Sequence, residues 1–175
     1  MTPDQNIQVW VAVGTWASSI GTIAAVITAL YLAKRAENVR LNVQVGLMQV
    51  VIGDGSPFQE HVGIVVTNLG ERPVTVNTVG WAIGKGKKRR LAIQPLNSPH
   101  SAQYPIELAH GKSASFLVSF DVMPDWKREF ATGFVRDLSD KALKTLVAQV
   151  HTSVGKTVDV HPRKDLLDAL KKFRK

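Results

Sequence analysis

Hydrophobic residues follow three different patterns along this chain, and each pattern predicts a different element. From Val9 to Ala33 the chain is mostly apolar and contains no Pro, Lys, Arg, Asp or Glu. From Val39 onward apolar and polar residues alternate, as in half-buried strands. From Asp165 the apolar residues return at helical spacing. The order predicts an N-terminal helix, a β domain and a short C-terminal helix.

The apolar run from Val9 to Ala33 predicts a membrane-spanning helix. About 20 apolar residues cross the hydrocarbon core of a bilayer, and this run is a little longer. Trp10 and Tyr31 fall near its ends, where aromatic rings prefer the interface, and hydroxyls within it can bond to backbone carbonyls. A cleaved signal peptide is the alternative, but its positive N-terminal region is missing. We therefore predict a retained anchor after a short tail, residues 1–8.

The flanking charges predict an orientation for this helix. Lys34, Arg35 and Arg40 follow its C-terminal end, and basic residues beside a span favour the cytoplasm. The prediction is a single-pass protein of the inner (cytoplasmic) membrane, with its N-terminus outside and its C-terminal domain cytoplasmic. Residues 34–38 form a juxtamembrane link. The opposite orientation stays open.

Small residues form a stripe along one side of the predicted span. They recur with alternating steps of three and four and are Gly14, Ala17, Gly21, Ala24 and Thr28. Small residues let helices approach closely in lipid, which predicts a homo-oligomer or a partner membrane protein. The alternative is that such residues are simply common in spanning helices.

The alternating region predicts a mainly β domain over residues 39–162. Strands are expected at 39–47, 61–68, 73–83, 89–94, 114–121, 145–152 and 156–160, with turn residues between them. Many short strands with such turns indicate an antiparallel, immunoglobulin-like β-sandwich. The signature of antibody domains, a pair of Cys around a Trp, is absent because the chain has no Cys, so this term describes architecture only.

Three helical segments are expected within and after the β domain. Residues 125–132 and 138–146 predict short helices, and residues 163–175 predict a basic amphipathic C-terminal helix. Its apolar stripe is Leu166, Leu167, Leu170 and Phe173. A helix of this kind can lie in a membrane interface.

A set of short motifs resembles a known group of proteins. These motifs are Thr67-Asn68-Leu69-Gly70, Arg72-Pro73-Val74, Pro105-Ile106-Glu107-Leu108 with Gly111, and Thr152-Ser153-Val154-Gly155-Lys156. With the single anchor they resemble a pattern in uncharacterised bacterial and prophage-encoded proteins. The resemblance implies an anchored sandwich and carries over no catalytic residues.

Catalytic, metal and cofactor signatures do not emerge from the sequence. The chain has no Cys, which excludes disulfides and thiolate sites. Gly111-Lys112-Ser113 and Gly155-Lys156-Thr157 lack the first Gly of a P-loop. The five His residues do not group at metal-ligand spacing, and no close carboxylate pair stands out. We expect no catalytic, metal-binding or cofactor-binding residue, although folding can assemble distant groups.

Basic clusters are the remaining signal. Residues 34–175 hold 22 Lys and Arg against 13 Asp and Glu, a net charge of +9. The clusters predicted to bind an anionic surface are a loop with Lys85, Lys87, Lys88, Arg89 and Arg90, and a C-terminal group with Lys171, Lys172, Arg174 and Lys175. Anionic lipid is one ligand for them, and plain solvation is the alternative. Nucleic acid is disfavoured because aromatic residues are scarce around the basic loop.

These observations together predict a non-enzymatic interaction module anchored in the lipid bilayer. It would bind a protein partner or the anionic membrane surface. The alternatives are a membrane-associated enzyme or effector with a site assembled in the fold, and a nucleic-acid-binding domain.

Overall fold

The N-terminal helix α1 runs from Pro3 to Ala36. The computed structural model describes residues 3–36, 38–51, 58–86, 89–136 and 140–173. It divides into two compact units, Met1–Asn38 and Val39–Lys175. We call the second unit the β domain.

Helix α1 is longer than the predicted span. The segment Ile7–Lys34 has a mean hydropathy of 1.6 and is long and apolar enough to cross a membrane. The helix already begins at Pro3, so the expected tail at residues 1–8 is largely helical. Proline suits the first turn of a helix because its missing N–H has no intrahelical partner there.

Hydroxyl groups within α1 are bonded to the helix backbone, as predicted. Thr15 Oγ1 donates to the Val11 carbonyl at 2.9 Å, and Thr28 Oγ1 donates to the Ala24 carbonyl at 2.8 Å. Ser19 and Thr22 make the same bond one turn back. Each of these hydroxyls is therefore satisfied without water, which suits an apolar environment.

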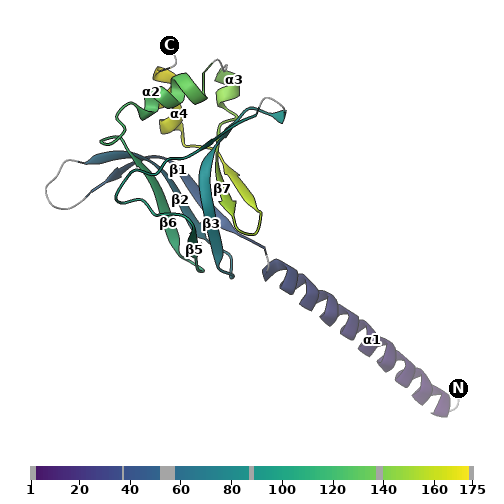
Figure 1. The fold of residues 1–175 in the computed structure, drawn as a ribbon. Helices are drawn as coiled ribbons and strands as arrows, with labels where there is room; N and C mark the ends of the chain where they lie inside the picture. The colour runs from purple at the N-terminus through teal and green to yellow at the C-terminus, as the bar shows by residue number, and fades with distance from the viewer. Residues whose placement is uncertain (1–2, 37, 52–57, 87–88, 137–139, 174–175) are drawn as a thin grey trace. The chain divides into compact units, whose positions relative to one another are not determined.

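Two antiparallel sheets form the β domain (Figure 1). The three-stranded sheet has the order β1-β2-β6, with β1 at Leu41–Val50, β2 at Gln59–Asn68 and β6 at Ser113–Ser119. The five-stranded sheet has the order β4-β3-β7-β8, with β5 also paired to β3. Its strands are β3 (Val74–Ile83), β4 (Arg90–Ile93), β5 (Ile106–Leu108), β7 (Val147–Thr152) and β8 (Thr157–Val160). The prediction of antiparallel strands is confirmed, but β5 was not among the expected strands.

The inner faces of both sheets share one hydrophobic core. Val45, Ile64 and Phe116 enter it from the three-stranded sheet, and Val79 and Trp81 enter it from β3. All five side chains are buried. The period-two alternation read from the sequence therefore separates the core side of each strand from its outer side.

Short helices gather at one end of the β domain, where β1 and β3 finish (Figure 1). They are α2 (Trp126–Glu129), the π-helix η2 (Phe130–Phe134), α3 (Asp140–Leu143) and α4 (Lys164–Lys172). We call this the helical end. The predicted helix at 125–132 is thus α2 continued by η2, and the one at 138–146 shrinks to α3.

Aromatic packing holds α2 and η2 on the sheets. The rings of Trp126 and Phe130 stack with centroids 4.7 Å apart, and Phe130 meets Trp81 edge-on at 5.3 Å. Trp81 Nε1 donates to the side-chain oxygen of Gln94. The indole thus buries its apolar ring while its polar atom is satisfied, as buried Trp requires.

The apolar stripe of helix α4 packs against the core of the β domain. Leu166 and Leu170 are fully buried in the core, and Leu167 packs against it. The expectation that this stripe can lie in a membrane interface is therefore wrong, because its central residues already contact the protein. Sequence periodicity shows that a helix has an apolar face, but both a core and a membrane can cover such a face.

Shortening the α4 stripe should destabilise the β domain. We expect Leu170→Ala to lower the free energy of unfolding by about 3 kcal/mol, since it leaves a cavity in a packed core. Leu167→Ala, at a half-buried position of the same helix, should cost about 1 kcal/mol or less. Chemical denaturation of both variants measures the difference. Equal, small effects would show that α4 does not belong to the core.

Candidate functional site

The predicted basic loop, residues 85–90, lies at the helical end. Its described side chains make different contacts. Lys87 and Lys88 lie outside the described residues. The Arg90 guanidinium donates to the carbonyls of Phe134 and Arg136, at 3.4 and 3.1 Å, so Arg90 fastens β4 to the end of η2. Lys85 and Arg89 remain as the members of this loop that line a pocket.

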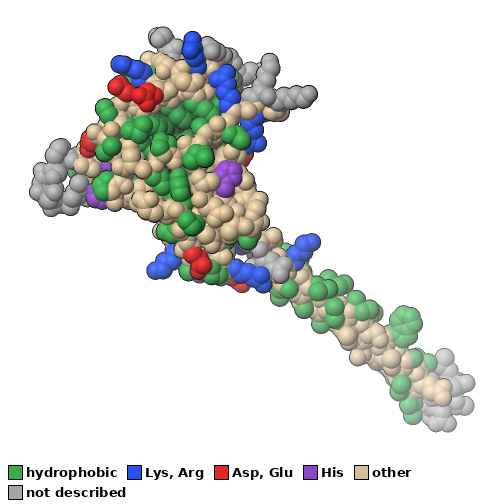
Figure 2. Space-filling model, in the orientation of Figure 1, with side chains coloured by type: hydrophobic (Ala, Val, Ile, Leu, Met, Phe, Trp, Pro, Cys, Tyr) green, Lys and Arg blue, Asp and Glu red, His purple; other side chains and the backbone are tan. Residues whose placement is uncertain are grey.

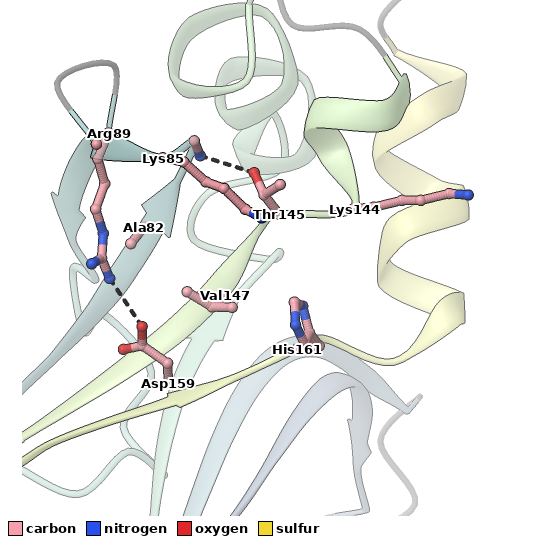
Figure 3. Close-up of a pocket in the computed structure, with 10 residues that line it drawn as sticks. Ala82, Lys85, Arg89, Lys144, Thr145, Val147, Asp159 and His161 are labelled. Carbon is pink, nitrogen blue, oxygen red and sulfur yellow. Dashed lines mark hydrogen bonds and ion pairs between the residues drawn. The ribbon is translucent and has the colours of Figure 1, made fainter.

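This pocket of about 450 Å³ lies on the outer face of the five-stranded sheet. Figure 3 shows its lining side chains, which come from the end of β3 and the β3–β4 loop, from the start of β7 and the residues before it, and from β8 and the residue after it. The lining residues are Ala82, Gly84, Lys85, Gly86, Arg89, Lys144, Thr145, Val147, Asp159 and His161. Four of them are basic or imidazole side chains and one is acidic, so the pocket favours an anion. We call it the basic pocket.

The acidic residue of the basic pocket is already paired. Asp159 Oδ2 lies 2.9 Å from Arg89 Nη2, and Asp159 Oδ1 accepts a hydrogen bond of 2.7 Å from Gln149 Nε2. Figure 3 shows Arg89 and Asp159 pointing toward each other across the sheet. The positive charge of Arg89 is therefore largely neutralised within the protein.

Lys85 and Lys144 are the lysines that line the basic pocket, and Figure 3 shows the Lys144 side chain extending away from the other lining residues. Neither ammonium group makes an ion pair with any residue that the structure describes. His161 Nδ1 donates to the Leu146 carbonyl at 3.0 Å, because a carbonyl can only accept. Its Nε2 is then the ring nitrogen left for a ligand. Lys144 and His161 were not predicted as site residues, because they lie far from the basic loop in sequence.

A hydrogen-bonded turn shapes one wall of the basic pocket. The Gly84 backbone N–H donates to Thr145 Oγ1 at 2.9 Å, and Thr145 Oγ1 donates to the Ala142 carbonyl at 2.7 Å. Gly84 has a φ of +88° and Gly86 a φ of +55°, which favour glycine. The loop that carries Lys85 is therefore fixed to the segment that carries Lys144.

The C-terminal basic cluster does not join the basic pocket. Lys171 Nζ lies 2.9 Å from Asp168 Oδ1, and this lysine holds the pKa of Asp168 below its usual value. Lys172 is exposed on the same helix, and neither lysine lines the pocket. Arg174 and Lys175 lie outside the described residues. The two predicted basic clusters thus share the helical end without forming one site.

The opposite end of the β domain is built around Asn68, which is fully buried. Its Nδ2 donates to the carbonyls of Arg72 and Leu108 at 2.8 and 2.9 Å, and its Oδ1 accepts from the Gly70 N–H at 2.8 Å. We call this the Asn68 end. Most of the motifs on which the sequence resemblance rests therefore lie at the Asn68 end, where their residues stabilise the fold through hydrogen bonds.

Four cationic residues lie at the Asn68 end. The Arg40 carbonyl accepts from Leu69 N at 2.8 Å, and the Lys112 carbonyl accepts from Asn68 N at 3.0 Å. Lys156 Nζ donates to the Val39 carbonyl at 2.6 Å. Arg72 is the fourth, through its contact with Asn68. The space-filling view shows Lys and Arg gathered toward the two ends of the β domain, with few along its middle (Figure 2).

The predicted membrane-orienting residues are divided between helix α1 and the β domain. Lys34 is exposed on α1, Arg35 lies within α1, and Arg40 belongs to the Asn68 end. The stripe of Gly14, Ala17, Gly21, Ala24 and Thr28 also lies on α1, exposed along its length. A Cβ at Gly14 or Gly21 would meet no atom within 4 Å, so this surface has room for another helix.

Ring nitrogens of four histidines, His61, His110, His151 and His161, make hydrogen bonds within the described part of the chain. His61 is fully buried, and its ring nitrogens bond the Gln59 carbonyl at 3.0 Å and Ser98 Oγ at 3.1 Å. Among the described residues no three His, Asp or Glu side chains group as metal ligands. Gly111 and Gly155 sit in turns with φ of +72° and +75°, consistent with the turn chemistry read from the sequence.

Comparison with known proteins does not assign the chain to a family. No protein-family model matches it, and no curated protein matches it. Among solved structures, one described as the putative ApaA protein from Bordetella pertussis is 13% identical, with a TM-score of 0.32, and the match covers 70% of this chain and 87% of that one. A Northeast Structural Genomics Consortium target is 9% identical, with a TM-score of 0.28 and coverage of 71% and 82%.

Replacing Asn68 should weaken the end of the domain that it organises. We expect Asn68→Ala to lower the free energy of unfolding by about 3 kcal/mol, because the carbonyls of Arg72 and Leu108 and the N–H of Gly70 lose the bonds they make with the Asn68 side chain. Asn42→Ala removes the same side chain from an exposed position of β1 and should change stability by less than about 0.5 kcal/mol. Denaturant titration of the two variants tests this; equal stability would contradict the role given to Asn68.

Proposed function

We propose that the protein is a single-pass, non-enzymatic interaction module of the inner membrane, whose β domain binds an acidic protein partner through the basic pocket. The observation that carries this proposal is that Lys85, Lys144 and His161 line one hollow, in which the acidic lining residue Asp159 is already paired with Arg89. We take the domain to be an immunoglobulin-like β-sandwich and the N-terminus to lie outside, with the basic flank of the span on the cytoplasmic side.

The position of the basic pocket within the domain favours a protein partner over lipid. The chain enters the domain at Leu41, which pairs with Asn68, whereas Lys85 follows the far end of β3. Ten residues of β3 extend over about 30 Å, several times the Debye length at physiological salt. Lys85 and Lys144 are therefore remote, within the domain, from the point where the chain arrives from α1.

Neutralising the basic pocket should weaken binding of an acidic ligand. The probe is fluorescein-labelled deca-glutamate, measured by anisotropy against the full chain in phosphatidylcholine nanodiscs. We expect the double variant Lys85→Gln/Lys144→Gln to bind about tenfold more weakly, since each surface charge contributes about 1 kcal/mol or less.

The matched control removes the same charge at the other end. Lys112→Gln/Lys156→Gln should change the affinity for deca-glutamate by less than about twofold. If both double variants lose affinity equally, the acidic probe responds to net charge and the basic pocket is not the site. Absence of any binding by the wild-type chain would also refute the proposal.

Anionic lipid is a second candidate ligand, and the Asn68 end favours it. Arg40, Arg72, Lys112 and Lys156 gather at the end of the domain where the chain enters. Residues 37–40 separate α1 from β1, and four residues reach at most about 14 Å. This tether length is near the Debye length, so these cations can interact with an anionic surface.

Hydrogen exchange should separate the lipid proposal from the protein proposal. In nanodiscs of phosphatidylglycerol, relative to phosphatidylcholine, we expect amides of 68–72 and 110–112 to exchange more slowly by about threefold or more. Lys112→Gln/Lys156→Gln should remove this protection, whereas Lys85→Gln/Lys144→Gln should keep it. Equal exchange in both lipids would exclude this contact.

A further inference from the structure

Strand β4 leaves one side of the five-stranded sheet open. It is the last strand beyond β3 in the order β4-β3-β7-β8. Gln94 N donates to the Val79 carbonyl at 3.0 Å, so by alternation the peptide groups of Ala92 also face β3. Those of Leu91 and Ile93 face outward. In the described part of the chain, no turn or loop backbone hydrogen bond reaches Leu91 or Ile93, and β3 is the strand that pairs with β4.

The side chains at this open edge are large and apolar. Leu91 is 67% exposed and Ile93 is 74% exposed, on the outer face of the sheet. They line a hollow of about 480 Å³ together with Thr78, Val79, Gly80, Ala92, Gln149 and His151. Gly80 adds no side chain to this hollow, and a Cβ there would collide with the Ala92 carbonyl oxygen. An open edge beside an apolar hollow is a template for an added strand.

The positively charged residues next to β4 indicate which side chains an added strand should carry. Arg89 and Arg90 directly precede Leu91, and Lys85 lies in the same loop. Because β4 runs away from these cations, a strand paired antiparallel to it would bring its C-terminal end toward them. Arg89 is paired with Asp159, but the partners of Arg90 are backbone carbonyls, which leave its positive charge in place, and Lys85 has no ion pair with a described residue. Acidic side chains at that end of the added strand would balance the positive charge of this loop.

We infer that β4 binds an extended segment of a partner protein as an antiparallel strand, with apolar residues at alternate positions and acidic residues at its C-terminal end. The inference rests on the proposed function and names the partner segment. A second copy of this chain is a poorer occupant, because residues 89–94 contain two Arg and no acid. Its β4 would therefore bring no negative charge to the basic loop.

The test removes an outward N–H without disturbing the sheet. Proline is tolerated on an edge strand where its nitrogen faces away from the neighbour, so Ile93→Pro deletes one edge donor and keeps the bonds to β3. Ile93→Ala is the matched control, since it also loses the side chain but keeps the N–H. The probe is a labelled peptide of about ten residues, alternating Val and Thr and ending in three Glu, added to the full chain in phosphatidylcholine nanodiscs.

We expect Ile93→Pro to bind this peptide at least about tenfold more weakly than Ile93→Ala. A peptide with Lys in place of Glu should also bind at least about tenfold more weakly to the wild-type chain. Equal affinities of the two variants would overturn strand pairing, and equal affinities of the two peptides would overturn the acidic occupant. Concentration-dependent self-association of the wild-type chain that Ile93→Pro abolishes would identify a second copy instead.

Hydrogen exchange of the wild-type chain supplies a readout that does not depend on a variant folding. Saturating peptide should slow the amides of Leu91 and Ile93 by at least about tenfold, while Ala92, already bonded to β3, changes little. Unchanged exchange at Leu91 and Ile93 overturns the inference. Deca-glutamate distinguishes the two proposals: if Ile93→Pro binds it as the wild-type chain does, a loss of peptide binding belongs to the edge and leaves the basic pocket unaffected.

Discussion

The alternation of side chains along β3 is the constraint on which most of the β domain depends. β3 pairs with β4, β5 and β7, so it aligns the five-stranded sheet. Its inward residues include Val79, Trp81 and Ile83, which enter the core. Gly80 and Ala82 face the other way, and each lines one of the two hollows on the outer face. A shift of one residue would exchange these sets and bury the wrong face.

The main strands could be predicted because each is long enough to show this alternation. β5 could not, since three residues between Pro105 and Ala109 carry too little pattern to distinguish a strand from a loop. The stripe of α4 was visible in the sequence, but its use was not. Leu166 and Leu170 meet the sandwich-like core only because distant segments converge at the helical end, and periodicity holds no information about which apolar surface a helix will meet.

The candidate site was predicted in part for the same reason. Lys85 and Arg89 lie in one charged loop, so composition alone drew attention to them. Lys144 and His161 are isolated in the sequence and reach the pocket through the register of β3, β7 and β8. Whether a strand is central or at an edge is likewise a property of pairing. The sequence Arg90-Leu91-Ala92-Ile93 therefore gave no sign that Leu91 and Ile93 face an open edge.

Distance along the chain is a poor guide to which charges lie at the same end of the β domain. Lys112 and Lys156 are far from Arg40 in sequence, yet the hydrogen bonds around Asn68 and Val39 bring them to the same end of the domain. Lys85 is closer in sequence and lies at the other end, because a whole strand separates it from Asn68. In a run of antiparallel strands the connecting turns alternate between the two ends, so every second turn lies at the same end. Which charges share an end of the β domain is thus set by strand direction and not by distance along the chain.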